Sequence, residues 1–92
     1  MRMLWLAPLA ALLLVVAGCN SEAKKREFFE AGKRLAAEEG YVVAILQFRN
    51  ALQNDEKYAD ARVQLAETLA LTGNPEGAYR EYQRAADLLP ND

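Results

Sequence analysis

Side chains that could take part in covalent chemistry are few in this chain, and no histidine is present to activate them. The 92 residues contain one cysteine, Cys19, and a serine, Ser21, stands close behind it. A nucleophilic Ser, Cys or Thr needs a base within hydrogen-bonding distance to become reactive. Thr68 and Thr72 also lack such a neighbour in the sequence, so we interpret both as surface residues. The sequence therefore predicts no nucleophilic catalytic centre.

Acidic residues and glycines are likewise arranged in ways that do not predict a reaction centre. The acidic pairs 38–39 and 55–56 are neighbours in sequence, and neighbours on a helix point in different directions. Such pairs fit solvated helix ends better than two catalytic carboxylates. The sequence contains no glycine-rich phosphate loop and no cluster of metal-ligating residues. We therefore expect no enzyme activity, no cofactor and no metal ion, and we expect the function to be binding.

Length, charge and cysteine count limit the class of protein further. At 92 residues the chain holds one domain at most. Its formal charge is −2 and its isoelectric point about 5.1, whereas a protein that binds duplex nucleic acid presents a basic surface. With one cysteine the chain cannot form an internal disulfide bond. We therefore expect neither a nucleic-acid partner nor a disulfide-stabilised fold.

The N-terminal residues are typical of a secretory targeting segment. One charge, Arg2, precedes an apolar run over residues 3–17 that Pro8 interrupts. This run is short for a membrane-spanning helix, which needs about 20 apolar residues, and its length suits a signal peptide. The run ends in residues 16–19, Val-Ala-Gly-Cys, and this sequence resembles the lipobox of bacterial lipoproteins.

The lipobox resemblance implies that Cys19 is lipid-modified. In that family, cleavage leaves the cysteine at the N-terminus, where its thiol carries diacylglycerol and its amine a further acyl chain. We therefore predict a signal peptide over residues 1–18 and a lipidated Cys19 with a tether over residues 19–24. Several acyl chains hold a protein stably at a membrane, which implies a lipoprotein facing the periplasm. Asn20 takes the place of the Asp that retains enterobacterial lipoproteins in the inner membrane, which favours the outer membrane.

A repeat with a period of 34 residues organises the rest of the chain. Five pairs of positions keep their size and polarity class at this offset: Gly32 and Ala66, Leu35 and Leu69, Ala44 and Ala78, Phe48 and Tyr82, and Ala51 and Ala85. Such a period is typical of stacked helical hairpins, in which small residues allow two helices to approach closely. We therefore expect the Gly and Ala positions at helix crossings, with Phe48 and Tyr82 filling the space beside them.

Start and stop signals divide this part of the chain into four helices. We predict them at residues 23–39, 41–54, 59–71 and 75–88, because apolar residues recur three and four positions apart within each. Gly40 breaks the pattern after the first. Asn74 suits the cap before the fourth helix, and Pro75 suits its first turn.

The two hairpins resemble tetratricopeptide repeats. The motif of that family is carried here by Ala-Gly with Leu35, then Ala44, Phe48 and Ala51, and again by Leu65-Ala66 with Leu69, then Ala78, Tyr82, Ala85 and Pro90. Two departures are Glu56, where the first repeat should have a proline, and Arg62, where the second should have an aromatic residue. The resemblance implies an all-α fold of two repeats, residues 25–58 and 59–92, forming a short right-handed α-solenoid.

Family resemblance also implies a groove lined by the first helix of each repeat. The groove positions in this sequence are Phe29, Lys33, Ala36, Val63, Gln64, Glu67 and Ala70. Chaperone-binding members use Lys and Asn to bind a terminal carboxylate, but Phe29 and Lys33 occupy those two positions, so this mode is not predicted. An amphipathic helix or extended segment of a partner suits such a groove. The alternative is that Phe29 and Val63 only pack locally.

These observations favour a lipid-anchored adaptor that binds an envelope protein or one of its segments. The combination is similar to lipoproteins that accompany exopolysaccharide and exosortase (PEP-CTERM) systems, pilus assembly or outer-membrane protein assembly. One alternative is a structural array, formed by self-association through the C-terminal helix or by the start of a longer repeat array in an export or assembly complex. Another is an uncleaved single-pass membrane protein with a helical domain.

Overall fold

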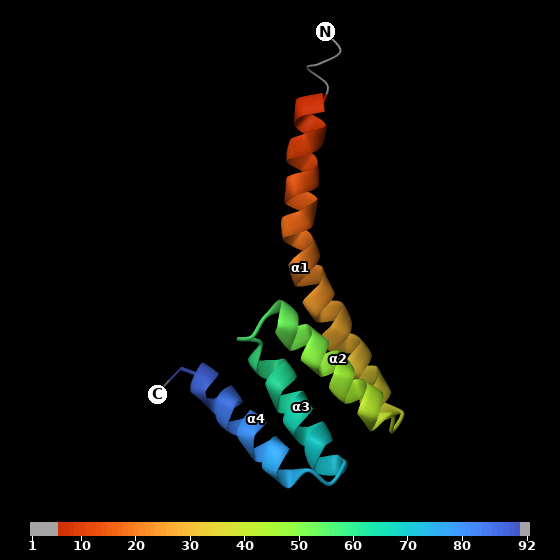
Figure 1. The fold of residues 1–92 in the computed structure, drawn as a ribbon, viewed down its shortest axis with the longest axis vertical. Coiled ribbons are helices and arrows are strands. Elements are labelled where there is room, and N and C mark those ends of the chain that lie inside the picture. The colour runs from red at the N-terminus through yellow and green to blue at the C-terminus, as the bar shows by residue number, and fades with distance from the viewer. Residues whose placement is uncertain (1–5, 91–92) are drawn as a thin grey trace.

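The computed structural model describes the backbone of residues 6–90 and the side chains of residues 20–90. Over the described backbone the chain is all-helical, with no strand. Its helices are α1 (Leu6–Ala37), α2 (Tyr41–Asn54), α3 (Ala59–Leu71) and α4 (Pro75–Leu88). Consecutive helices pack side by side, α1 with α2, α2 with α3, and α3 with α4 (Figure 1). The all-α class is confirmed, and the last three helices begin and end where the sequence predicts.

The first helix starts earlier than the sequence predicts. It begins at Leu6 instead of residue 23, so the predicted tether residues 20–24 are helical rather than extended. A helix rises about 1.5 Å per residue, less than half the rise of extended chain, so this segment bridges a shorter distance than a tether would. Cys19 and the predicted signal peptide lie outside the residues whose side chains are described. Within the described part of the chain, no helix is both long and apolar enough to span a membrane.

The end of α1 uses a left-handed residue that is not the predicted glycine. Glu39 has a φ of 65°, and the Gly40 N–H then donates to the Leu35 carbonyl at 2.8 Å. At the end of α3 the matching position of the repeat is Gly73, with a φ of 81°. Because a side chain disfavours left-handed backbone, Glu39 adds strain to the first hairpin that Gly73 avoids in the second.

The start of α4 matches the sequence prediction. The Asn74 side chain caps the helix, because its Oδ1 accepts a hydrogen bond from the Gly77 N–H at 3.0 Å. Pro75 occupies the first turn, where its missing N–H costs nothing. The α3–α4 turn is therefore fixed by local sequence.

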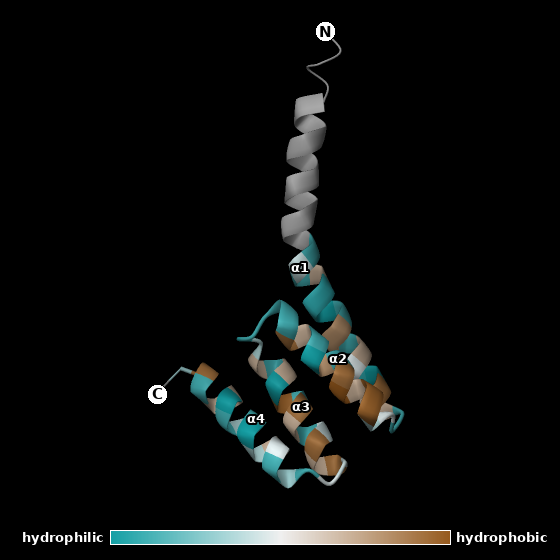
Figure 2. Ribbon diagram, viewed as in Figure 1, coloured by the Kyte–Doolittle hydropathy of each residue, from teal (hydrophilic) through white to brown (hydrophobic). Residues whose placement is uncertain are grey.

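The core lies where α1, α2 and α3 meet. Ala44, Phe48 and Ala51 of α2 are completely buried, with Leu65 and Ala66 of α3 close behind at 1% and 0% exposed. Hydrophobic residues gather on α2 and α3, whereas α4 is largely hydrophilic (Figure 2). Within the second hairpin, the larger buried apolar side chains, Leu65 and Leu69, therefore come from α3.

Gly32 lets α1 and α2 approach each other closely. It is buried, and a Cβ added there would lie 2.5 Å from the Phe48 ring. Real side chains do not approach that closely, so the ring occupies the space that a larger residue would need. The close approach of α1 and α2 therefore depends on the absence of a side chain at this position.

Tyr82 departs from its predicted place in the core. It is 42% exposed, although its counterpart Phe48 is 0% exposed. Phe48 lies on α2, which packs against both α1 and α3, whereas α4 packs only against α3 among the described helices. The equivalent face of α4 therefore has no second helix over it within residues 6–90.

Candidate binding surfaces

Phe29 belongs to the core instead of an open groove. It is 8% exposed, and its ring centroid lies 4.9 Å from that of Tyr58 and 6.1 Å from that of Phe48. Tilted aromatic pairs at these distances are favourable packing contacts. Phe29 thus fills the junction between α1, α2 and the start of α3, so it offers little surface to a partner.

The other predicted groove residues of α1 lie around this aromatic cluster. Ala36 is half-buried and packs against the core. The Lys33 Nζ lies 4.7 Å from the Phe29 ring centroid and 3.3 Å from a Glu30 carboxylate oxygen. Of the three predicted α1 positions, only Lys33 therefore presents a polar group at the surface.

The predicted groove residues of α3 share one accessible side of that helix. Glu67 and Ala70 are exposed, and Val63 and Gln64 are half-buried. Successive helical residues are turned by about 100°, which puts Val63, Glu67 and Ala70 opposite the buried Leu65. The α3 part of the predicted surface is therefore open to solvent.

Thr68 differs from its predicted surface position. It is 2% exposed, and its hydroxyl donates a hydrogen bond to the Gln64 carbonyl at 2.7 Å. A buried hydroxyl with such a partner has its hydrogen bond satisfied.

Over the described side chains no group of three or more His, Cys, Asp or Glu residues could hold a metal ion.

A salt bridge that the sequence analysis did not predict joins α1 to the α2–α3 turn. The Lys25 Nζ lies 2.7 Å from a carboxylate oxygen of Asp55 and 3.0 Å from one of Glu22. It also lies 5.0 Å from the centroid of the Tyr58 ring. The Lys25–Asp55 contact spans 30 residues of sequence, so no local pattern could have shown it.

The pKa values of these groups follow from the same contacts. The hydrogen bond from Lys25 lowers the pKa of the Asp55 carboxyl. The hydrogen bond to Asp55, followed by that to Glu22, raises the pKa of the Lys25 ammonium. Burial raises the pKa of the Tyr58 hydroxyl. The charged forms of Lys25 and Asp55 are therefore the ones that the fold stabilises.

A buried carboxylate connects α3 to α4. Glu81 is 6% exposed, and its two carboxylate oxygens accept hydrogen bonds from Arg62 and Arg84, each at 2.9 Å. The Arg62 Nε and a second guanidinium nitrogen donate to the Glu56 carbonyl at 3.2 and 3.0 Å. The sequence showed that Arg62 replaces the aromatic residue of the repeat pattern, but it did not show that Arg62 would pair with Glu81.

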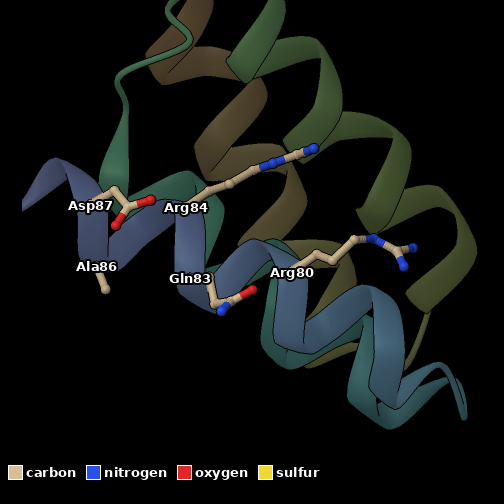
Figure 3. Close-up of a pocket in the computed structure, with 5 residues that line it drawn as sticks. All are labelled: Arg80, Gln83, Arg84, Ala86 and Asp87. Carbon is tan, nitrogen blue, oxygen red and sulfur yellow. The ribbon is translucent and has the colours of Figure 1, made fainter.

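These arginines border a hollow of about 290 Å³ between α2, α3 and α4, the interhelical hollow. It is lined by Arg49, Leu52, Gln53, Glu56, Arg62, Leu65, Glu81 and Arg84. A second hollow of about 350 Å³ lies along α4 and is lined by Arg80, Gln83, Arg84, Ala86 and Asp87 (Figure 3). Neither hollow includes any of the seven predicted groove residues.

The two α3 surfaces lie on opposite sides of that helix. Arg62 and Leu65, which line the interhelical hollow, are three positions apart and share a side. Val63 and Glu67 are turned away from them by the helical period. The described part of the chain therefore has two separate candidate surfaces, one predicted from the sequence and one found only in the structure.

Comparison with known proteins gives no match to a family model and no match to a curated protein.

Proposed function

We propose that the chain is a lipid-anchored tetratricopeptide-repeat adaptor that binds another protein of the bacterial envelope. The proposal is supported chiefly by burial that repeats with the 34-residue period. Ala44 and Ala78 are 0% and 4% exposed, and Ala51 and Ala85 are 0% and 3% exposed. Equal burial of small residues at equal spacing is what stacked helical hairpins require.

The anchor part of the proposal comes from residues 16–19 and from the apolar run before them. Mass spectrometry of the mature N-terminus tests it directly. We expect a chain that begins at an acylated Cys19. An unmodified Cys19 still preceded by Gly18 would refute the anchor and favour an uncleaved membrane segment.

The adaptor part is tested by photo-crosslinking in cells from the accessible α3 surface. A photoreactive residue at Glu67, which is exposed, should capture a distinct envelope protein. The matched control places the same residue at Arg34 on the exposed side of α1, where we expect no such product. Crosslinks from Glu67 to copies of the same chain alone would contradict the adaptor and favour the structural array.

That structural array is the second candidate function, and α4 carries the observation that favours it. Tyr79 and Tyr82 of α4 and Leu89 directly after it are 64%, 42% and 60% exposed, and contiguous patches of exposed apolar residues mark interaction sites. Self-association through α4 would cover them. Sedimentation of residues 20–92 over a range of concentrations tests this candidate, because the mass of a self-associating chain must increase with its concentration.

A further inference from the structure

The interhelical hollow exists because α2 and α4 pack on α3 without approaching each other. Leu52 and Leu65, at 8% and 1% exposed, form its apolar floor. Charged residues from α2, from the α2–α3 turn, from α3 and from α4 form its rim. The hollow therefore offers apolar contact beneath a ring of charges, and no position of the predicted groove takes part in it.

Positive and negative charges around the hollow are unequal in number, and they differ in how many hydrogen bonds they make within the chain. Three guanidinium groups face two carboxylates in the lining, although the whole chain has a formal charge of −2. Glu81 is already neutralised by Arg62 and Arg84, and Arg62 directs its remaining contacts to the Glu56 carbonyl. The buried part of the network is therefore satisfied within the chain.

Two arginines keep unused hydrogen-bonding capacity at the rim. The Arg84 side chain is 59% exposed, and it forms an ion pair with Glu81 through one of its nitrogens. Arg49 is exposed, and no ion pair of the described residues includes it. A guanidinium group has five donors. Both therefore have donors left for an external acceptor.

The positive charge continues along the outer side of α4. Arg84 also lines the second hollow, together with Arg80 and Asp87. Figure 3 shows the Arg80 and Arg84 side chains extending in the same direction from α4, while Gln83 and Ala86 point to another side. An acidic ligand held at Arg84 would thus meet a further guanidinium group one helical turn away.

We propose that the interhelical hollow binds an acidic peptide segment of a protein partner, with a carboxylate held between Arg49 and Arg84. An apolar neighbour of that carboxylate rests on the floor at Leu52. The proposal rests on the adaptor function and names the chemistry of its partner. A carboxylate suits the site better than a phosphate, because Glu56 and Glu81 in the lining repel a doubly charged group and leave an excess of only one positive charge.

The test uses the full chain, purified in a mild non-ionic detergent, and an end-blocked, fluorescein-labelled octapeptide of alternating Glu and Leu. Fluorescence anisotropy should show saturable binding that weakens as salt is added, because partly exposed ion pairs are screened. The same peptide with Gln in place of Glu should bind at least about tenfold more weakly. Equal binding of the two peptides would overturn the proposal.

Charge-matched variants then locate the site. Arg49→Gln should weaken binding of the Glu–Leu peptide about fivefold, as expected for one partly exposed ion pair. Arg34→Gln removes the same charge from the exposed side of α1 and should leave binding unchanged. Equal weakening in both variants would show a general charge effect and overturn the assignment. Circular dichroism of each variant verifies that the fold is kept, and Arg49 makes no ion pair among residues 20–90 whose loss could unfold it.

Two further outcomes separate this proposal from its alternatives. Glycerol phosphate that competes as well as unlabelled peptide would identify a lipid headgroup or free phosphate as the ligand, and would overturn the peptide assignment. Failure of the Glu–Leu peptide to bind, while the Glu67 crosslink still captures an envelope protein, would refute the hollow and leave the adaptor function standing. Peptide binding without any such crosslink would support the hollow and count against the α3 surface.

Discussion

Truncation of Phe48 and of Tyr82 to alanine should have very different effects, although the two occupy the same position of the repeat. Phe48 is 0% exposed, and truncating a fully buried Phe costs about 3–5 kcal/mol because a cavity remains. Tyr82 is 42% exposed, and its truncation leaves an open surface. Fully burying an aromatic side chain contributes about 1.5–3 kcal/mol. Scaled by the buried fraction of Tyr82, this gives an expected cost of about 1–2 kcal/mol for Tyr82→Ala.

The size of the domain makes this difference easy to observe. A core of about 70 residues rarely supplies more than about 3–5 kcal/mol of stability. Phe48→Ala should therefore abolish the unfolding transition of residues 20–92 at room temperature, whereas Tyr82→Ala should keep a transition at lower urea. Phe48→Leu removes fewer atoms and should leave a transition that can still be measured.

Urea unfolding followed by far-ultraviolet circular dichroism is the assay, carried out at two protein concentrations. Equal losses for Phe48→Ala and Tyr82→Ala at low concentration would refute the reasoning, because they would mean that Tyr82 is as well packed as Phe48. A loss for Tyr82→Ala that grows with concentration would show that another copy covers α4. That result would favour the structural array over the adaptor.

Three further predictions concern single contacts. Glu39→Gly should stabilise the chain by up to about 1 kcal/mol, because glycine adopts the positive φ without strain, and an unchanged melting temperature would contradict this. Arg62→Ala should cost about 1.5–3 kcal/mol in urea unfolding, because Glu81 loses a charged hydrogen bond while buried, whereas a cost near zero would show that Arg84 suffices. The lowered pKa of Asp55 contributes stability that is present above its ordinary pKa of 3.8 and is lost as the pH falls through the lower folded pKa. The raised pKa of Lys25 contributes stability that is present below its ordinary pKa of 10.5 and is lost as the pH rises through the higher folded pKa. Asp55→Asn should flatten both limbs of the melting temperature against pH, and an unaltered profile in that variant would exclude this salt bridge as the source.

Local signals in the sequence were enough to place most helix boundaries. Asn74 and Pro75 fix the start of α4 through their own backbone and side-chain chemistry, which needs no distant partner. Gly40 marked the turn after α1, but the helix ends at Ala37 and the left-handed position is Glu39. The start of α1 was predicted at residue 23, whereas the helix begins at Leu6 and passes through that position without a break.

The spacing of residues could not show which of the predicted groove positions are accessible, because periodicity assigns a face of a helix without saying what covers it. Phe29 has the spacing of a groove residue, yet Tyr58 and Phe48 enclose it. Tyr58 belongs to the turn before α3, and nothing in the spacing of α1 indicates that this ring lies against Phe29. Val63, Glu67 and Ala70 kept their accessible side, since only α2 and α4 pack closely on the opposite sides of α3.

The sequence by itself determined the all-α class, the bounds of α2, α3 and α4, and the 34-residue spacing of small residues, because each depends on contacts within a few residues or on a repeated pattern. Only the tertiary structure decided that Tyr82 is exposed while Phe48 is buried, and that Arg62, Glu81 and Arg84 meet beside a hollow. The Arg62–Glu81 contact joins residues 19 positions apart. It depends on how α3 and α4 pack, which no local pattern specifies.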